Sequence, residues 1–479
     1  MTPLVALSHT WITYMLELLA LLVWVTTIIV VITENRNPVK TLAWVMVLVF
    51  LPIVGFILYL LFGTDMRRMR IISKRSLSRL MKEPLLNYRD HVMPTPPEPY
   101  GKLVGMMKRT AQSTLLGGNS VKSFTDFPTM LHDLLRAIAC ARHHIHIQFY
   151  ILMDDAVGRL LRDALISKVR EGVQVRLLYD DVGSWKAHKR FFRTMQEEGI
   201  EVYAFGEVKI AALAQRVNYR NHRKVVVIDG EVGYVGGMNI AERYYRGLPW
   251  GCWRDTHIRI DGMAAVALQT SFFVDWYYAT HQLISAPAYF PKVPHRGDTA
   301  MQIVTSSPMG EWHTIMQGLL QVISQSRRYL YIQTPYFLPT EPILTALRNA
   351  ALAGVDVRLM VPHRGDSLLV DLASRSYYKE VMLAGVKIYR YEAGYLHAKV
   401  VIADDNFVTV GSTNIDFRSF EHNFEINAFI YDPKVVGQMK RIFMNDLQNA
   451  TRIVFSEWVR RPLWHRFWES LVRLLAPLL

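Results

Sequence analysis

The feature that most constrains this chain is a polar motif that occurs twice, 175 positions apart. Each copy has a His, a Lys two residues later, an Asp five residues beyond the Lys and an Asn ten residues beyond the Asp. The motif residues are His222, Lys224, Asp229 and Asn239 in the first copy and His397, Lys399, Asp404 and Asn414 in the second. A repeat of this length indicates a duplicated fold, and we expect the functional site where the two copies meet.

The segments that lead to the two motif copies share one order of predicted secondary structure. β-prone runs alternate with stretches of helical periodicity. The expected strands are 144–152, 173–179 and 200–205 in the first copy and 329–337, 355–361 and 386–391 in the second. Strands and helices that alternate at this spacing predict sheets covered by helices. The sequence therefore predicts an α/β fold built from two halves, residues 101–290 and 291–460.

Local backbone geometry is expected to bring the motif side chains of each copy together. A Val-rich strand begins after each His, so the His and the Lys two residues later share one face. Asp229-Gly230 is a strong signal for a hairpin turn. Gly236-Gly237 and Gly411-Ser412 allow a sharp turn before each Asn. Each copy thus offers one imidazole, one ammonium and one amide to a shared site.

This set of side chains suits phosphodiester transfer. Ammonium and amide groups hold the phosphoryl oxygens as negative charge redistributes in the transition state. One neutral imidazole can attack phosphorus while the other, protonated, donates to the leaving oxygen. A single His-x-Lys on a strand would indicate little, but two complete copies favour this chemistry. We expect no metal and no cofactor.

Two apolar runs open the chain. They cover residues 11–32 and 41–62, and each is about 22 residues long, enough to cross a bilayer. A pair of buried core helices is the alternative. We expect residues 1–64 to form a transmembrane helical hairpin and residues 65–100 to form a basic, Pro-rich linker. The basic residues after the second run place the soluble body on the cytoplasmic side; they are Arg67, Arg68, Arg70, Lys74, Arg75 and Arg79.

Residues 461–479 combine Trp, Phe and Leu with arginines in an amphipathic pattern. Such a helix either lies in the membrane interface or packs on the core of its own protein, and both readings stay open. The formal net charge of +14 indicates an anionic partner, either a membrane surface or nucleic acid. The two cysteines are too few for a disulfide framework.

Both motif copies resemble the paired HKD motifs of the phospholipase D superfamily. Further segments are similar to bacterial cardiolipin synthases within that superfamily: Glu34-Asn35-Arg36-Asn37-Pro38, 41–44, 51–55, 253–256 and 414–419. The resemblance implies duplicated phospholipase D-like α/β domains with the active site between the two halves, preceded by the transmembrane hairpin.

The resemblance also implies roles for individual residues. One motif histidine forms a phosphatidyl-histidine and the other is the acid and base; we assign His222 as the nucleophile and His397 as the acid and base, and the two roles could be exchanged. Lys224, Lys399, Asn239 and Asn414 are expected to bind phosphate. Asp229 and Asp404 belong to the catalytic motifs, although their place beside turns favours a structural role. Asp255 and Glu425 are expected to orient the histidines from behind.

The implied reaction transfers a phosphatidyl group from one phosphatidylglycerol to another and releases glycerol. The implied partners are phosphatidylglycerol and other anionic phospholipids, without nucleic acid, and the implied location is the bacterial inner membrane as a multi-pass protein. The oligomeric state is left open. Alternatives are a phospholipase D-type hydrolase, a phosphatidylserine-forming transferase, a nuclease and an inactive membrane scaffold. His144 and His146 share a strand face and offer a weaker alternative, a metal site.

Overall fold

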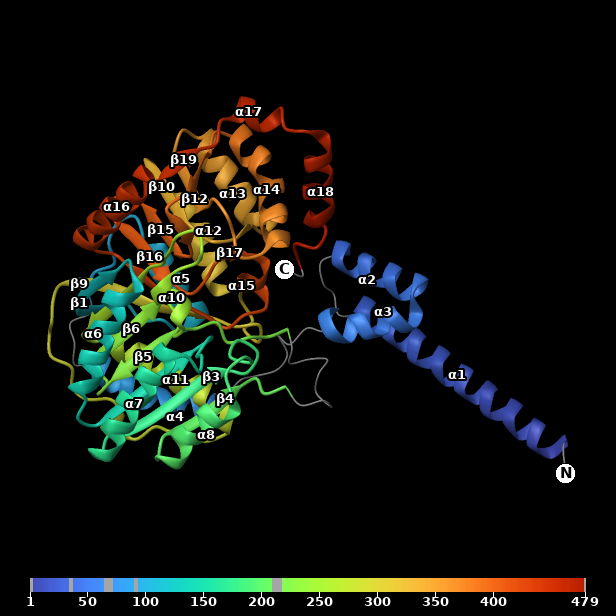
Figure 1. Cartoon of the computed structure of the whole chain (residues 1–479), viewed down its shortest axis with the longest axis horizontal. Helices are drawn as coiled ribbons and strands as arrows, with labels where there is room; N and C mark the ends of the chain where they lie inside the picture. Colours follow the sequence, from blue (N-terminus) through green and yellow to red (C-terminus); the bar gives the residue numbers. More distant parts are fainter. Residues whose placement is uncertain (1–2, 34–37, 64–71, 90–93, 209–217, 478–479) are drawn as a thin grey trace. The chain divides into compact units, whose positions relative to one another are not determined.

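The computed structural model describes residues 3–33, 38–63, 72–89, 94–208 and 218–477 (Figure 1). Two compact units emerge, an N-terminal helical unit and a large α/β body, and each is described by itself. The connecting turn expected at 34–37 and the basic residues Arg67, Arg68 and Arg70 lie outside the described residues.

The N-terminal unit contains α1 (Pro3–Thr33), α2 (Pro38–Phe50), α3 (Pro52–Leu58) and a π-helical turn (Tyr59–Gly63). Within α1 the stretch Thr13–Thr33 is long and apolar enough to cross a membrane, and no other described helix meets both conditions. The helices pack through a small cluster that includes Val31, Leu48 and Tyr59.

The second apolar run differs from our expectation of one continuous span over 41–62. It is divided between α2 and α3, because Pro52 lacks the N–H that would continue the helix and its ring clashes with the preceding turn. Leu51 leaves the helical conformation, with φ −133° and ψ 68°. The chain then folds back so closely that a Cβ on Gly55 would lie 2.7 Å from the Val47 carbonyl oxygen. The described part of this unit therefore contains one apolar helix long enough to span a membrane, α1, and a shorter apolar helix, α2.

The body begins with two helices. Helix α4 (Lys74–Arg89) lies in the segment that we expected to be a linker, and it packs on the body through Leu80, which is fully buried. Helix α5 (Gly101–Ala111) was expected in the first half, but its Leu103 and Met107 join the hydrophobic core of the second half. Apolar spacing at helical period explains both differences.

The first half is a mixed sheet with helices on its faces (Figure 1). Its strands are β1 (Leu116–Phe124), β2 (His144–Phe149), β3 (Gln174–Asp180), β4 (Glu201–Phe205), β5 (Val225–Ile228), β6 (Val232–Gly236), β7 (Cys252–Arg254) and β8 (His257–Asp261). Its helices are α6 (Phe127–Ala139), α7 (Ala156–Arg170), α8 (Lys189–Glu197), α10 (Glu242–Arg246) and α11 (Ala264–Thr280), with a 3-10 turn at Pro287–Tyr289. Strands β2, β3 and β4 run parallel, whereas β2, β5, β6 and β8 pair antiparallel in that order.

The second half repeats this pattern of parallel and antiparallel strand pairing. Its strands are β9 (Thr299–Ser306), β10 (Tyr329–Gln333), β11 (Phe337–Leu338), β12 (Asp356–Pro362), β13 (Lys387–Tyr391), β14 (Gly394–Leu396), β15 (Val400–Ala403), β16 (Phe407–Gly411), β17 (Ile415–Asp416), β18 (Glu425–Ile430) and β19 (Ala450–Arg452). Its helices are α12 (Thr314–Gln325), α13 (Glu341–Leu352), α14 (Leu368–Leu383), α15 (Phe417–Glu421), α16 (Pro433–Gln448), α17 (Phe455–Val459) and α18 (Leu463–Arg473). Strands β10, β12 and β13 run parallel, and β10, β15, β16 and β18 pair antiparallel in that order.

One sheet joins the two halves. Strand β1 pairs antiparallel with β9, with Leu116 opposite Met301, and each of these strands also pairs within its own half. The described strands of this sheet follow the order β19-β13-β12-β10-β15-β16-β18-β9-β1-β8-β6-β5-β2-β3-β4. The duplicated α/β fold is confirmed, and the sheet holds the two motif copies in a fixed relation.

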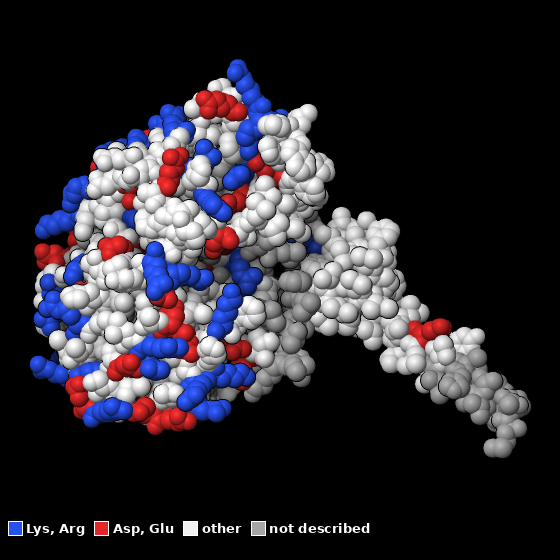
Figure 2. Space-filling model, in the orientation of Figure 1, with Lys and Arg blue, Asp and Glu red and all other residues white. Residues whose placement is uncertain are grey.

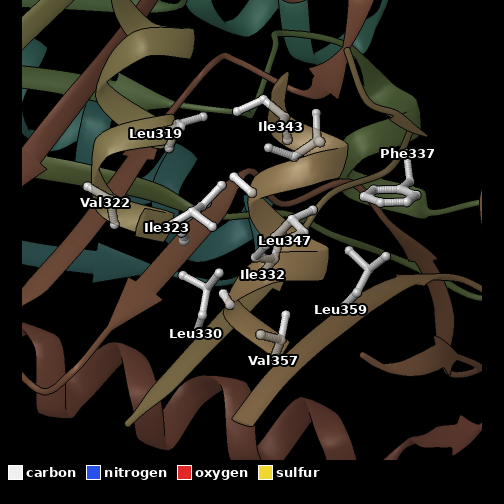
Figure 3. Close-up of a cluster of buried hydrophobic side chains, with 14 of the residues drawn as sticks. Leu319, Val322, Ile323, Leu330, Ile332, Phe337, Ile343, Leu347, Val357 and Leu359 are labelled. Atoms are coloured by element: carbon white, nitrogen blue, oxygen red, sulfur yellow. The ribbon is translucent and has the colours of Figure 1, made fainter. Parts of the chain in front are cut away.

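Helices cover the sheet through apolar side chains. In the second half, Leu319 and Ile323 of α12 and Leu347 of α13 point toward Leu330 of β10 and Val357 of β12 (Figure 3). Continuous apolar strands buried on both faces are the expected pattern for such a layered fold. This packed core lies behind the second motif copy.

Candidate active site

A cavity of about 290 Å³ lies between the two motif copies. His222 and Asn239 of the first copy line it together with His397 and Asn414 of the second. The expectation that the copies meet at one site therefore agrees with where these four side chains lie.

His222 is positioned by the second half. The residues before β5 form a parallel bridge with the chain before β18, and the His222 N–H donates to the Phe424 carbonyl at 3.0 Å. Its Nδ1 lies 3.0 Å from one carboxylate oxygen of Glu425 and 3.2 Å from the other. Glu425 also accepts from Ser412 Oγ and, at 3.2 Å, from the Asn423 amide.

His397 is positioned by the first half in the same manner. Strand β14 runs parallel to β7, and the His397 N–H donates to the Arg254 carbonyl at 2.7 Å. Its Nδ1 lies 2.6 Å from Oδ2 of Asp255. Each motif histidine is thus held by a carboxylate from the opposite half, so neither half forms a complete site alone.

Burial lowers the pKa of both His222 and His397 to about 4, although their carboxylate partners act against this shift. Both imidazoles are therefore neutral near pH 7 in the empty site. The pKa of Asp255 and of Glu425 lies below its ordinary value, because nearby lysine and histidine charges outweigh burial. An ionised carboxylate only accepts hydrogen bonds, so each Nδ1 carries the proton and each Nε2 keeps its lone pair for a substrate.

Each motif lysine contacts the backbone of the motif histidine two residues before it. Lys224 Nζ donates to the His222 carbonyl at 2.5 Å, and Lys399 Nζ donates to the His397 carbonyl. Both side chains are almost fully buried. Burial lowers the pKa of Lys224 to about 7 and that of Lys399 to about 8, while Glu425 and Asp255 oppose the shift. Both ammonium charges are therefore present only at lower pH, and Lys224 loses its charge before Lys399 as the pH rises.

The motif asparagines are fixed by short turns. Asn239 Oδ1 accepts from the Ile151 N–H at 3.0 Å, and its amide donates to the Tyr244 hydroxyl at 2.6 Å. The Asn414 N–H donates to Ser419 Oγ at 3.2 Å. Both asparagines precede a short helix, α10 or α15, that starts at the cavity wall.

The motif aspartates lie outside the cavity. Asp229 accepts from the N–H groups of Arg142, His143 and His144 at 2.8–3.0 Å, at the start of β2. Asp404 does the same before β10; its donors are Arg327, Arg328 and Tyr329. Both aspartates have left-handed backbone conformations, with φ 53° and 49°. These contacts favour the structural role over a catalytic one.

Several cavity residues were not predicted from the sequence. Tyr150 directly follows β2, and Tyr336 lies three residues after the end of β10. Arg243 and Arg418 each lie four residues after a motif asparagine, again 175 positions apart. This repeat spacing was the available signal. Trp253 and Asp366 also line the cavity, and Asp366 accepts a hydrogen bond from the Tyr336 hydroxyl at 2.9 Å.

His144 and His146 are core residues around one amide. His144 Nε2 and His146 Nδ1 lie 3.0 and 2.9 Å from Oε1 of Gln269, and His146 stacks on Phe272. Within the described ranges, no three His, Cys, Asp or Glu side chains form a group suited to a metal ion. These two histidines therefore read as packing residues.

Comparison with known proteins points to one family. The domain model described as "Cardiolipin synthase, PLD-like domain" matches residues 134–248 and 319–447, and a phospholipase D-nuclease N-terminal model matches residues 22–63. The chain is 42% identical to the major cardiolipin synthase ClsA of Bacillus subtilis over 94% of this chain and 96% of that protein. It is 39% identical to the cardiolipin synthase of Halalkalibacterium halodurans over 94% of this chain and 91% of that protein.

The fold resembles a solved structure as well. A phosphatidylserine synthase of Haemophilus influenzae superposes with a TM-score of 0.60 over 79% of this chain and 98% of that chain. The sequence identity is only 14%, so this likeness concerns the duplicated fold and not the substrate.

Proposed function

This chain belongs to the cardiolipin synthases of the phospholipase D superfamily, and on that premise we propose that it joins two phosphatidylglycerol molecules through a phosphatidyl-histidine intermediate. The chain is a phosphatidyltransferase. The mechanism is supported by the two motif histidines, which line one cavity and are each held at Nδ1 by a carboxylate of the opposite half.

In the first step, Nε2 of His222 attacks the phosphorus of the donor phosphatidylglycerol. The bond from phosphorus to the glycerol headgroup breaks, and the leaving oxygen takes a proton from His397. The bound phosphodiester anion favours the imidazolium form of His397, and Asp255 at 2.6 Å stabilises it further. Glycerol leaves, and the phosphatidyl group stays on His222.

In the second step, neutral His397 removes a proton from the terminal hydroxyl of a second phosphatidylglycerol. The resulting oxygen attacks phosphorus, the bond to His222 breaks, and cardiolipin forms. One phosphodiester is exchanged for another, so the reaction requires no nucleotide. Lys224, Lys399, Asn239 and Asn414 are proposed to hold the phosphoryl oxygens in both steps.

The assignment of His222 as nucleophile is supported by its weaker carboxylate contact. Glu425 divides its hydrogen bonds among His222, Ser412 and Asn423, whereas Asp255 makes a shorter contact with His397. A shared carboxylate stabilises an imidazolium less, which keeps His222 neutral and nucleophilic. We expect His222→Ala to form no covalent phospholipid adduct in mass spectra of protein quenched in acid-free buffer. An adduct in His222→Ala that is lost in His397→Ala would reverse the assignment.

Product analysis tests the reaction. Purified protein in phosphatidylglycerol vesicles with a chelator is expected to release cardiolipin and glycerol in equal amounts. Phosphatidic acid without cardiolipin would instead make the chain a hydrolase. Phosphatidylserine formed on addition of serine, in preference to cardiolipin, would instead make the chain a phosphatidylserine-forming transferase.

The chain is membrane-associated, as its family and the apolar helix α1 indicate. The multi-pass topology expected from two apolar runs lacks support, since α1 alone in the described ranges has the length of a span. We propose that α1 anchors the chain in a bacterial inner membrane with the body in the cytoplasm. The density of arginine after residue 66 supports this side.

The sequence of the C-terminal helix α18 left two interpretations open, packing on the core of the protein and lying in the membrane interface. The structure has features of both. One face packs on α14 through buried Val472 and through Arg473, which lies over the ring of Tyr377. The other face is apolar and exposed: Leu463, Trp464, Phe467, Trp468, Leu471, Leu474 and Leu475. The surface over α18 is correspondingly free of acidic side chains in Figure 2. We propose that this face lies in the membrane interface.

A spin label tests the position of α18. Phe467→Cys would be labelled in full-length protein whose exposed Cys140 and Cys252 are changed to Ser. In phosphatidylglycerol vesicles the label is expected to be relaxed more by oxygen than by a water-soluble nickel complex. A label at exposed Trp185 serves as the aqueous control. Equal nickel accessibility at both positions would contradict the proposal.

A further inference from the structure

The repeat places an arginine in the wall of the cavity from each half. Arg243 lies on α10 and Arg418 on α15, each four residues after its motif asparagine. Among the described residues that line the cavity, the lysine and arginine side chains are these two. The motif lysines lie deeper, against the histidine carbonyls. The cavity thus has basic side chains at two depths, the arginines in its wall and the lysines below, and the carboxylates of Asp366 and Asp416 also line it.

Arg243 is held by aromatic contacts. Its guanidinium lies 5.5 Å from the ring centre of Trp253 and 5.7 Å from that of Tyr244. Among described residues, no carboxylate forms an ion pair with Arg243, whereas Arg246 on the same helix pairs with Glu242 at 2.7 Å. The charges of Arg243 and Arg418 both act on the phenol of Tyr150 in the cavity wall, where they oppose the rise that burial causes in its pKa.

The proposed reaction brings two phosphodiesters into this cavity. The reacting phosphate is bound by the motif histidines, lysines and asparagines. The acceptor phosphatidylglycerol carries its own phosphate, three carbons from the hydroxyl that attacks. This second anion stays charged throughout, and a desolvated anion close to another anion requires a cationic partner. The motif residues supply none for it.

We propose that Arg243 and Arg418 bind the unreacting phosphate of the acceptor lipid, an inference that rests on the proposed transfer between two phosphatidylglycerols. A guanidinium presents paired N–H donors that match a phosphate, and it stays charged at every physiological pH. The two arginines therefore select an acceptor alcohol that bears a phosphate over water and over free glycerol. They determine the fate of the phosphatidyl-histidine, not its formation.

Two reactions of the same intermediate test this subsite. Cardiolipin synthesis uses an acceptor with a phosphate, whereas exchange of radiolabelled glycerol into phosphatidylglycerol uses an acceptor without one. Full-length Arg243→Gln and Arg418→Gln would be assayed for both in phosphatidylglycerol vesicles. We expect cardiolipin synthesis to fall about tenfold or more, through a higher KM for lipid, with glycerol exchange within about twofold of the unchanged protein.

Arg246→Gln is the matched control, because Arg246 shares helix α10 with Arg243 but does not line the cavity. It should leave both reactions unchanged. Arg418→Lys keeps the charge without the planar fork, so it should retain folding and still lose cardiolipin synthesis. Equal loss of both reactions, or loss of neither, in Arg243→Gln and Arg418→Lys would overturn the subsite. Glycerol exchange without cardiolipin in the unchanged protein would instead overturn the proposed function.

Discussion

The protonation of four buried side chains controls this site at the scale of single residues. In the empty site His222 and His397 are neutral, because burial outweighs their carboxylate partners. The lysines beneath them carry a charge that burial weakens. Nucleophile and phosphate-binding charge therefore coexist only between the pKa values of the histidines and those of the lysines. An anionic substrate stabilises the cationic forms, which supplies the one imidazolium that the reaction needs.

The first prediction concerns the pH dependence of kcat/KM. We expect a bell-shaped profile that rises near pH 4, where the nucleophile His222 loses its proton, and falls at higher pH as the proton of His397 is lost and, above about pH 7–8, the lysine ammonium charges are lost as well. Glu425 is the largest charge that holds up the pKa of Lys224. Glu425→Gln should therefore move the alkaline limb to lower pH. Initial rates of cardiolipin formation at low phosphatidylglycerol would measure it.

The control for this profile is Glu457→Gln, which removes an exposed carboxylate on α17. Its two limbs should coincide with those of the unchanged protein. An alkaline limb of Glu425→Gln that stays in place would show that Lys224 does not set it.

At the scale of elements, the motif aspartates connect the hairpins to the strands beside them. Asp229 has a left-handed backbone before Gly230 and caps three consecutive N–H groups at the start of β2. Asp404 does this for β10. Asp229 thus aligns β5 with β2, and Asp404 aligns β15 with β10. Strands β5 and β15 each begin directly after a motif lysine. We infer that the aspartate occurs in both motif copies because each half needs this strand alignment to position its histidine.

The second prediction separates structure from chemistry at Asp229. Asp229→Asn keeps the tolerance for a left-handed backbone but removes the charge and one acceptor, so we expect unfolding to become easier by about 1–3 kcal/mol. The kcat of the folded protein should stay within about threefold. Thermal unfolding in detergent and the assay of the folded fraction measure the two effects. Asp163→Asn, at an exposed ion pair with Arg162, is the control.

A variant of Asp229 with unchanged thermal stability and lost turnover would contradict this role. It would place the carboxylate in the chemistry, although it lies outside the cavity.

The repeat spacing explains which elements could be predicted and which could not. The motif residues and the strands before them recur at one spacing, so the two halves and their meeting point follow from the sequence. Asp255 and Glu425 do not share that spacing, and each contacts a histidine at least 142 positions away. Family resemblance indicated them, whereas local pattern could not. Arg243 and Arg418 did carry the repeat signal, which we missed because it lies beyond the motif.

The N-terminal helices show a different limit. The run 41–62 has no charge, and its length alone suggested a span. Pro52 lies in the middle of it, where a proline costs a helix about 3 kcal/mol or more. Hydropathy reports composition and not backbone continuity, so the break at Leu51 was not predicted.

At the scale of the whole molecule, two buried ion pairs connect the catalytic residues to the helices behind the sheet. Arg223, between His222 and Lys224, contacts Asp275 of α11 at 2.7 Å. Arg254, beside Asp255, contacts Asp446 of α16 at 2.7 Å. In each case a strand glutamine, Gln148 or Gln333, donates to the same carboxylate at 2.7 Å. Each half thus contains a buried network of one arginine, one helix aspartate and one strand glutamine. These networks fix the position of the site relative to the sheet.

The last prediction tests the network around Arg223, which also crosses between the halves. Its Nε donates to the Glu425 carbonyl and its Nη2 to the Ser306 carbonyl, both at 3.1 Å. Asp275→Asn keeps the shape of the side chain but leaves a buried guanidinium without its counter-charge, so we expect a loss of about 3–5 kcal/mol in unfolding free energy. Thermal or denaturant unfolding in detergent measures this loss.

The double variant Arg223→Gln/Asp275→Asn distinguishes a coupled pair from two separate contributions. Because it leaves no unpaired charge, it should be more stable than the sum of the single changes predicts, by at least about 1 kcal/mol. Turnover should fall in both variants that lack Arg223, since the backbone of Glu425 then loses a donor and the carboxylate that holds His222 is no longer fixed. Strict additivity of the unfolding free energies would show that the two side chains act independently.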